Sequence, residues 1–203
     1  EGKSALIKLN RPEKLNALTY PMIMEINTLL ESIKKEKKIR AIVIEGNGDG
    51  FCSGDDLDRM RPEGFKFTLL EDGLQIPHQK MLQMITTIPK PVIAHIHGFC
   101  FGAGFDLALA CDFRIALDTM TIGDHRIKRA IAVLCGATWL LPRIVGLGRA
   151  IEIIQTGKHL TASEALSIGL VTRVYENENF PENSNTFIEY IANFPTKCFG
   201  YNK

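Results

Sequence analysis

Short runs of apolar residues alternate along this chain with longer segments in which apolar residues recur every three or four positions. The runs predict buried strands at 5–9, 41–45, 92–96, 113–116 and 170–174. The periodic segments predict helices at 19–33, 76–88, 105–111, 137–145 and 149–155, with part of a last one at 187–194. Because strands and helices alternate, the pattern predicts an α/β fold with parallel strands.

Two segments carry sequence signals for the start of a helix. Thr19, followed by Pro21 in the first turn, is typical of a helix start. Thr161 and Glu164 form a capping box, which predicts a further helix that ends at Gly169.

Three segments outside the regular pattern are also informative. The basic run at 34–38 ends the first helix, where cations complement the negative end of the helix dipole. Residues 61–74 are rich in charge and glycine, and we expect a mobile surface segment able to cover a ligand. Residues 121–126 are expected to form a loop.

Glycines mark the point where the strand at 92–96 turns into a helix. Gly98, Gly102 and Gly104 can adopt backbone angles closed to other residues, which permits a sharp turn. Such a turn points unpaired backbone N–H groups into the space above it, and the helix dipole favours an anion or a developing oxyanion there. A second glycine turn lies at residues 51–57.

Other interpretations of the first turn remain open at this level. Its glycines are also compatible with close packing alone. The dinucleotide fingerprint needs a third glycine and the P-loop a lysine, and the sequence has neither at the required position. Residues 98–102 fit a nucleophile elbow with Cys100 as nucleophile, whose acid and histidine would be Asp124 with His125 or His159.

Composition limits the classes of function. The 203 residues, 45% of them hydrophobic, suit one well-buried domain, which we expect to span 1–203. A net charge of +1 provides no general basic field for nucleic acid or an anionic membrane. No apolar run reaches the roughly 20 residues of a membrane span, and no signal-peptide pattern is present, so we expect a cytoplasmic protein.

The cysteines and histidines show no metal or disulfide pattern. Five cysteines, at 52, 100, 111, 135 and 198, include no C-x-x-C pair, as expected for buried thiols in a reducing compartment. The five histidines lack ligand spacing such as H-E-x-x-H. We therefore expect no metal site.

A series of short motifs with compatible spacing runs through nearly the whole chain. They are Leu9-Asn10-Arg11-Pro12, Leu15-Asn16-Ala17-Leu18, Ala41-Ile42-Val43-Ile44, Phe51-Cys52-Ser53-Gly54-Asp55-Asp56-Leu57, Lys90-Pro91-Val92-Ile93-Ala94, residues 98–112, Leu141-Pro142-Arg143-Ile144-Val145-Gly146, Thr156-Gly157 and residues 162–174. This series resembles the crotonase family, the enoyl-CoA hydratase and isomerase superfamily. The resemblance implies a crotonase-like ββα spiral core with flanking and C-terminal helices, of which the C-terminal part, after about residue 180, is shorter than usual.

The resemblance also implies a substrate bound as a coenzyme A thioester, with no cofactor beyond that coenzyme A moiety. In such enzymes one backbone N–H from each glycine turn holds the thioester oxygen as it becomes an enolate. The matching donors are Asp55 N–H and Ala103 N–H, and Asp55, Asp56, Leu57 and Asp58 would line the coenzyme A site. Assembly as a homotrimer or a dimer of trimers is implied as well.

The acid/base positions depart from the hydratase pattern. A hydratase of this family uses two glutamates, whose positions hold Asp106 and Arg126 in this chain. An arginine does not give or take a proton at neutral pH, so we do not expect simple two-carboxylate hydration. One carboxylate suffices for double-bond isomerisation, and decarboxylation or thioester hydrolysis also needs fewer such groups, with Arg126 available to grip a substrate carboxylate.

We therefore predict an acyl-CoA-processing enzyme of the enoyl-CoA hydratase/isomerase type, with Asp106 and Arg126 in the catalytic site. An acyl-CoA binder without catalysis remains an alternative. So does replacement of the missing acid by Asp124 or His125, although neighbouring side chains in a loop usually point apart.

Overall fold

The computed structural model describes residues 2–58, 77–133 and 135–203. Within them, five parallel strands form the main sheet in the order β1 (Ser4–Leu9), β2 (Ala41–Gly46), β3 (Val92–Ile96), β5 (Phe113–Leu117) and β8 (Arg173–Tyr175). A smaller sheet contains β4 (Phe99–Phe101), β6 (Thr121–Gly123) and β7 (His159–Thr161). The predicted α/β class is confirmed.

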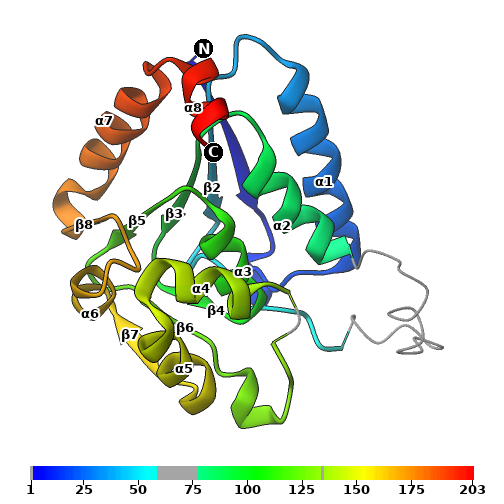
Figure 1. The fold of residues 1–203 in the computed structure, drawn as a ribbon, viewed down its shortest axis with the longest axis vertical. Helices are drawn as coiled ribbons and strands as arrows, with labels where there is room; N and C mark the ends of the chain where they lie inside the picture. The colour runs from blue at the N-terminus through cyan, green and yellow to red at the C-terminus, as the bar shows by residue number, and fades with distance from the viewer. Residues whose placement is uncertain (1, 59–76, 134) are drawn as a thin grey trace.

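Helices lie on both faces of the main sheet and beside the smaller sheet. They are α1 (Tyr20–Lys35), α2 (Pro77–Thr87), α3 (Ala103–Ala110), α4 (Ala137–Val145), α5 (Leu147–Thr156), α6 (Ala162–Ser167), α7 (Phe180–Ala192) and α8 (Thr196–Asn202), with short 3-10 turns at Pro12–Lys14, Arg126–Arg129 and Asn177–Asn179. Figure 1 shows α1 and α2 packed together on one side of the sheet and α7 on the other. None of the helices described is long and apolar enough to cross a bilayer.

Alternation of side chains along the strands divides the core in two. Ile42 and Ile44 on β2 belong to the larger cluster, which also contains apolar residues of α1, α2 and α3. Val43 belongs to a smaller cluster with Phe187 and Ile191 of α7. Because successive side chains point to opposite faces, a strand buried on both sides reads as the continuous apolar run seen in the sequence.

The longer predicted elements agree with the structure. The strands at 5–9, 41–45, 92–96 and 113–116 are β1, β2, β3 and β5, and Thr19 immediately precedes α1. The capping box at the start of α6 is confirmed, because Thr161 Oγ1 accepts from Glu164 N and Glu164 Oε2 accepts from Thr161 N at 2.9 Å.

Several shorter elements differ from the sequence expectations. Residues 121–126 are not a plain loop, because β6 occupies Thr121–Gly123 and pairs with β4. The last strand begins at Arg173 rather than 170. Leu170 and Val171 are buried in the core but precede the strand, so their apolar character reflects core packing. The helix predicted to include 187–194 runs from Phe180 to Ala192, and it is not the last, because α8 follows it. The predicted mobile segment 61–74 lies outside the described residues.

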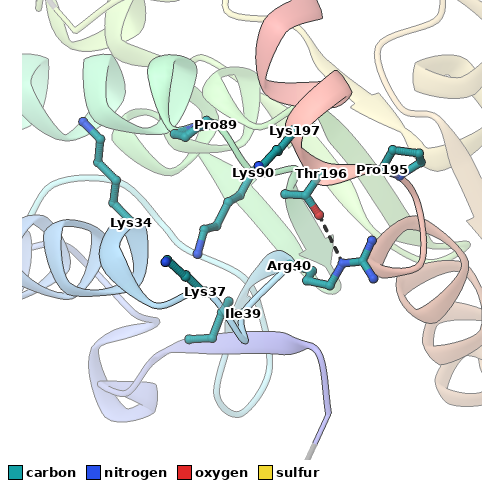
Figure 2. A pocket seen from close by; sticks show the side chains of 9 residues that line it. All are labelled: Lys34, Lys37, Ile39, Arg40, Pro89, Lys90, Pro195, Thr196 and Lys197. Carbon is teal, nitrogen blue, oxygen red and sulfur yellow. Dashed lines mark hydrogen bonds between the residues drawn. The ribbon is translucent and has the colours of Figure 1, made fainter.

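A cavity of about 610 Å³ opens at the amino ends of β2 and β3. Figure 2 shows the cationic side chains around it, which are Lys34, Lys37, Arg40, Lys90 and Lys197. Lys90 is buried and donates to the carbonyl oxygens of Ile33 and Glu36, both at 2.6 Å. It thereby adds to the capping of the C-terminal end of α1, where Glu36 N also donates to Ile33 O at 3.1 Å.

Candidate active site

The two glycine turns are paired through their backbones. Cys52 and Cys100 form an isolated parallel bridge, in which Phe101 N donates to Cys52 O at 2.9 Å. Asp55 lies three residues after Cys52, and Ala103 lies three residues after Cys100. Because the two segments run parallel, Asp55 and Ala103 lie at corresponding positions beside each other.

The backbone angles favour glycine where the turns touch. Gly54 and Gly102 have φ values of 112° and 54°, in the left-handed region that favours glycine. A Cβ on Gly54 would lie 3.5 Å from the Ala103 nitrogen, and a Cβ on Gly102 would lie 3.5 Å from the Gly54 Cα. The predicted donor residues are thus neighbours across a contact made by backbone atoms.

The N-terminal motifs hold the first turn in position. Asn16 is fully buried, its Oδ1 accepts from Arg11 N at 2.9 Å, and its Nδ2 donates to Asn47 O and Gly50 O at 2.8 Å. Arg11 Nη2 in turn donates to Asp56 Oδ2 at 2.9 Å. A buried amide with its hydrogen bonds satisfied fixes the loop that leads into the turn.

Asp55 and Ala103 both line a narrow cavity of about 50 Å³ between the turns. Within the described residues neither N–H donates a hydrogen bond. Ala103 is the first residue of α3, so its N–H also carries part of the positive end of the helix dipole. Two free amides in a narrow site suit an oxygen that gains negative charge, and removing one such donor typically costs about 3 to 4 kcal/mol of transition-state stabilisation.

Asp106, Arg126 and Asp124 form a buried charge cluster beside this cavity. Arg126 Nη2 lies 2.8 Å from Asp106 Oδ2 and 2.5 Å from Asp124 Oδ2, and Arg126 Nε lies 3.0 Å from both Asp124 oxygens. The Asp106 contact is an ion pair without hydrogen-bond geometry, whereas Asp106 Oδ1 accepts from Ala137 N at 2.8 Å. Because the chain's own carboxylates engage this guanidinium, the geometry does not favour a grip on a substrate carboxylate.

The surroundings of Asp106 suit a proton-transfer group. Burial raises its pKa to about 6, an effect that the Arg126 charge opposes and the Asp124 charge reinforces. A group that changes charge near neutral pH is well matched to acid/base catalysis. Arg126 is among the residues that line the cavity, and its Nη2 lies 2.8 Å from Asp106 Oδ2, so Asp106 is next to the lining.

Asp124 and His125 face different partners. Asp124 is occupied by Arg126, whereas the His125 ring contacts the rings of Phe101 and His159, with centroids 5.3 and 5.5 Å away. The two side chains therefore do not form a joint acid/base unit. Among the described residues, no cluster of three or more His, Cys, Asp or Glu side chains is placed to hold a metal ion.

The residues predicted to line the coenzyme A site differ in their contacts. Asp56 is paired with Arg11 and so helps to hold the turn. Leu57 lines the narrow cavity and is 43% exposed, and Asp58 is exposed. Their contact with coenzyme A remains a prediction.

The structure adds His78, which the sequence did not single out. This residue lies on α2, and its Nε2 is 2.8 Å from Asp55 Oδ1. The contact joins a turn to a helix 23 positions away. A lone histidine in an amphipathic segment carries no motif, so only the folded chain shows this pair.

Cys100 does not have the environment of a nucleophile. It lies in β4, its side chain is fully buried, and burial raises its pKa well above the usual value. Its Sγ donates to Gly104 O at 3.3 Å, and no histidine of the described chain hydrogen-bonds it. The geometry gives the cysteine hydrolase hypothesis no support.

Comparison with known proteins assigns the chain and its fold to one family. The family model described as enoyl-CoA hydratase/isomerase matches residues 2–200. The protein YngF of Bacillus subtilis is 40% identical over 171 residues, which are 84% of this chain and 65% of YngF. The short-chain-enoyl-CoA hydratase of Clostridium acetobutylicum is 35% identical over 181 residues, covering 87% of this chain and 67% of that protein.

Solved structures agree with this comparison. The enoyl-CoA hydratase from Bacillus anthracis superposes with a TM-score of 0.88 at 33% identity, over 97% of this chain and 75% of that one. This chain thus spans about two thirds to three quarters of the length of these relatives. It belongs to the enoyl-CoA hydratase/isomerase family.

Proposed function

We propose that this chain processes acyl-CoA thioesters by stabilising an enolate between the amides of Asp55 and Ala103. The observation that supports the proposal is the pairing of the two glycine turns, which brings two unengaged N–H groups to one narrow cavity. Such preorganised donors act on the charge that develops in the transition state and need no acidic side chain. The coenzyme A moiety enters as part of the substrate, and we propose no other cofactor.

The reaction we propose is proton transfer between carbons of the enolate, as in double-bond isomerisation. Arg126 occupies the second glutamate position and is held by two carboxylates, so it does not act as an acid or base. Asp106, with a pKa raised to about 6 by burial, is the proposed proton-transfer group. The Escherichia coli relative named 1,2-epoxyphenylacetyl-CoA isomerase, 31% identical over 198 residues, shows that isomerase names occur among the relatives.

Mass spectrometry of acyl-CoA mixtures tests this proposal. We expect conversion of 3-hexenoyl-CoA to 2-hexenoyl-CoA, with slower or no addition of water to crotonyl-CoA. Asp106→Asn is expected to lower the isomerisation rate by about 10²- to 10⁴-fold while thioester binding persists. The exposed Asp118→Asn serves as control. Absence of binding to every thioester tested would overturn the proposal.

We further propose that the chain assembles as a homotrimer or a dimer of trimers. Large apolar side chains are exposed on α4 and α5, with Trp139 at 62%, Leu147 at 65% and Ile151 at 52%. Neighbouring exposed apolar residues often mark an interface between subunits. Sedimentation equilibrium should give a trimer or hexamer mass that falls in a Leu147→Asp variant, whereas a monomer at micromolar concentration contradicts this assembly.

A further inference from the structure

The side chain of Asp55, a residue that lines the narrow cavity, is paired with the ring of His78. Their atoms lie 2.8 Å apart, and the side chains are 22% and 6% exposed. Asp55 lines the cavity together with Ala103 and Arg126. Enolate stabilisation uses only the backbone N–H of Asp55, which leaves this carboxylate without a role.

The second ring nitrogen of His78 is also unusual. Its Nδ1 is buried and has no hydrogen-bond partner in the described part of the chain. The Tyr20 ring lies edge-on to the imidazole, with centroids 6.1 Å apart. Leaving a buried polar atom unpaired typically costs about 1 to 3 kcal/mol, so packing alone does not explain a histidine here.

Asp55 and Asp106 are both close enough to Cys135 to influence its thiol. Burial raises the pKa of Cys135 to about 12, and the charges of Asp106 and Asp55 both add to this rise. One thiol thus lies within electrostatic reach of the two carboxylates, which come from different glycine turns. Arg126 and Arg129 line the cavity as well and offset negative charge there.

We propose that the Asp55 carboxylate, positioned by His78, is the second proton-transfer group of this site, in place of the glutamate whose position Arg126 fills. This assignment rests on the function proposed above. In isomerisation of a 3-enoyl thioester, Asp55 Oδ takes the proton from C2, the C–H electron pair moves to the thioester oxygen, and the Asp55 and Ala103 amides hold that oxygen. Asp106 in its neutral form then delivers a proton to C4, and solvent restores both carboxyl groups.

This proton transfer leaves the net charge of the cavity unchanged. A permanent carboxylate beside the developing oxyanion would oppose it through like-charge repulsion. When Asp55 accepts the proton, however, it loses its negative charge as the thioester oxygen gains one. The net charge of the cavity is unchanged, and the hydrogen bond from His78 keeps the carboxyl group in place.

Hydrogen exchange at C2 of the substrate distinguishes the role of Asp55 from that of Asp106. Butyryl-CoA in heavy water lacks a double bond, so exchange at its C2 needs only the amides and the base. We expect Asp55→Asn, which keeps the backbone N–H, to slow this exchange at least 100-fold, and Asp106→Asn to change it less than about fivefold. Unchanged exchange in Asp55→Asn overturns the assignment.

His78 is a positioning residue, and a graded series tests that role. His78→Gln offers an amide in place of Nε2 and should retain more exchange than His78→Leu, with the loss in kcat rather than KM. His95→Gln is the matched control, because His95 pairs with Glu45 at 3.1 Å on the main sheet away from the cavity. Equal effects of Gln and Leu at position 78, or a loss confined to KM, contradict positioning. Should Asp55→Asn fail to fold, the position 78 series decides the question.

A labelled substrate gives an independent result. With 3-hexenoyl-CoA deuterated at C2, two separate groups predict that the product carries solvent hydrogen at C4. Transfer of the C2 label to C4 means that one group moves the proton, which overturns the assignment while leaving the proposed function intact. If the unmodified protein neither exchanges nor isomerises any thioester, the proposed function itself fails.

Discussion

At the scale of single residues, Asp106 is both buried and paired with a charged group, and burial has the larger effect on its pKa. The carboxyl is 1% exposed and has one backbone donor and one guanidinium nearby. Its pKa still rises from the usual 3.8 to about 6. Taking a carboxylate out of water therefore outweighs its partners, as is usual for charges moved into a protein interior.

The raised pKa predicts how stability depends on pH. The folded chain holds this proton more tightly than the unfolded chain, so Asp106 costs nothing below about pH 4 and costs stability as pH rises through about 6. Above that the cost is on the order of 3 kcal/mol. In urea unfolding, the stability of Asp106→Asn relative to the unmodified chain should thus improve between pH 4 and pH 7.5. An equal difference at both pH values contradicts the shift.

The thiols should react according to their burial. Cys52, Cys100 and Cys111 are buried, and burial raises the pKa of each, to about 12 for Cys52 and Cys111, whereas Cys198 is exposed. With a disulfide reagent at pH 8 we expect rapid labelling at Cys198 and labelling of the three buried thiols only on unfolding. Peptide mass spectrometry identifies the sites, and fast native labelling of Cys100 would contradict this order.

At the scale of elements, length decided what the sequence could predict. β3 and α1 have enough residues to show a period, and both were predicted. β4, β6 and β7 have three residues each, and their pairing depends on partners far away in sequence, so no local pattern signals them. The residues of the candidate site also divide into those with a local sequence signal and those without one.

The local glycine motifs predicted free backbone donors at both turns, and the family resemblance identified these donors as Asp55 and Ala103. The pairing of Asp55 with His78 did not, because it depends on how α2 packs against the first turn. Likewise, the sequence identified Arg126 as a departure from the hydratase pattern, but its engagement by Asp124 required the folded loop.

Gly104 tests the contact between α3 and the first glycine turn. A Cβ at this position would lie 2.6 Å from Cys52 Cβ and 2.8 Å from Cys52 O. Gly104→Ala should therefore destabilise the chain by about 1 to 3 kcal/mol and lower turnover by separating the two amides. Gly148 of α5 has nothing within 4 Å of its Cβ position, so Gly148→Ala should be neutral or stabilising by up to about 1 kcal/mol. Urea unfolding compares them, and equal effects contradict the packing argument.

At the scale of the whole molecule, a net charge of +1 conceals an uneven distribution. The end of α1, the start of β3 and the start of α8 bring their cations together around the cavity of Figure 2. Within the described residues none of these cations forms an ion pair with a carboxylate. Folding therefore brings Lys90 and Lys197 to the cations at 34–40, and this repulsion opposes the compact state.

Reversing one of these charges should stabilise the protein. Lys37→Glu replaces repulsion with attraction and should raise the free energy of unfolding by roughly 0.2 to 1 kcal/mol at low ionic strength. The gain should shrink in 0.5 M salt, where the Debye length is only a few ångströms. Lys158→Glu is the control with the opposite sign, because Lys158 lies 3.7 Å from carboxylate oxygens of both Glu152 and Glu164. If the two variants shift stability in the same direction, local repulsion around the cavity is not the cause.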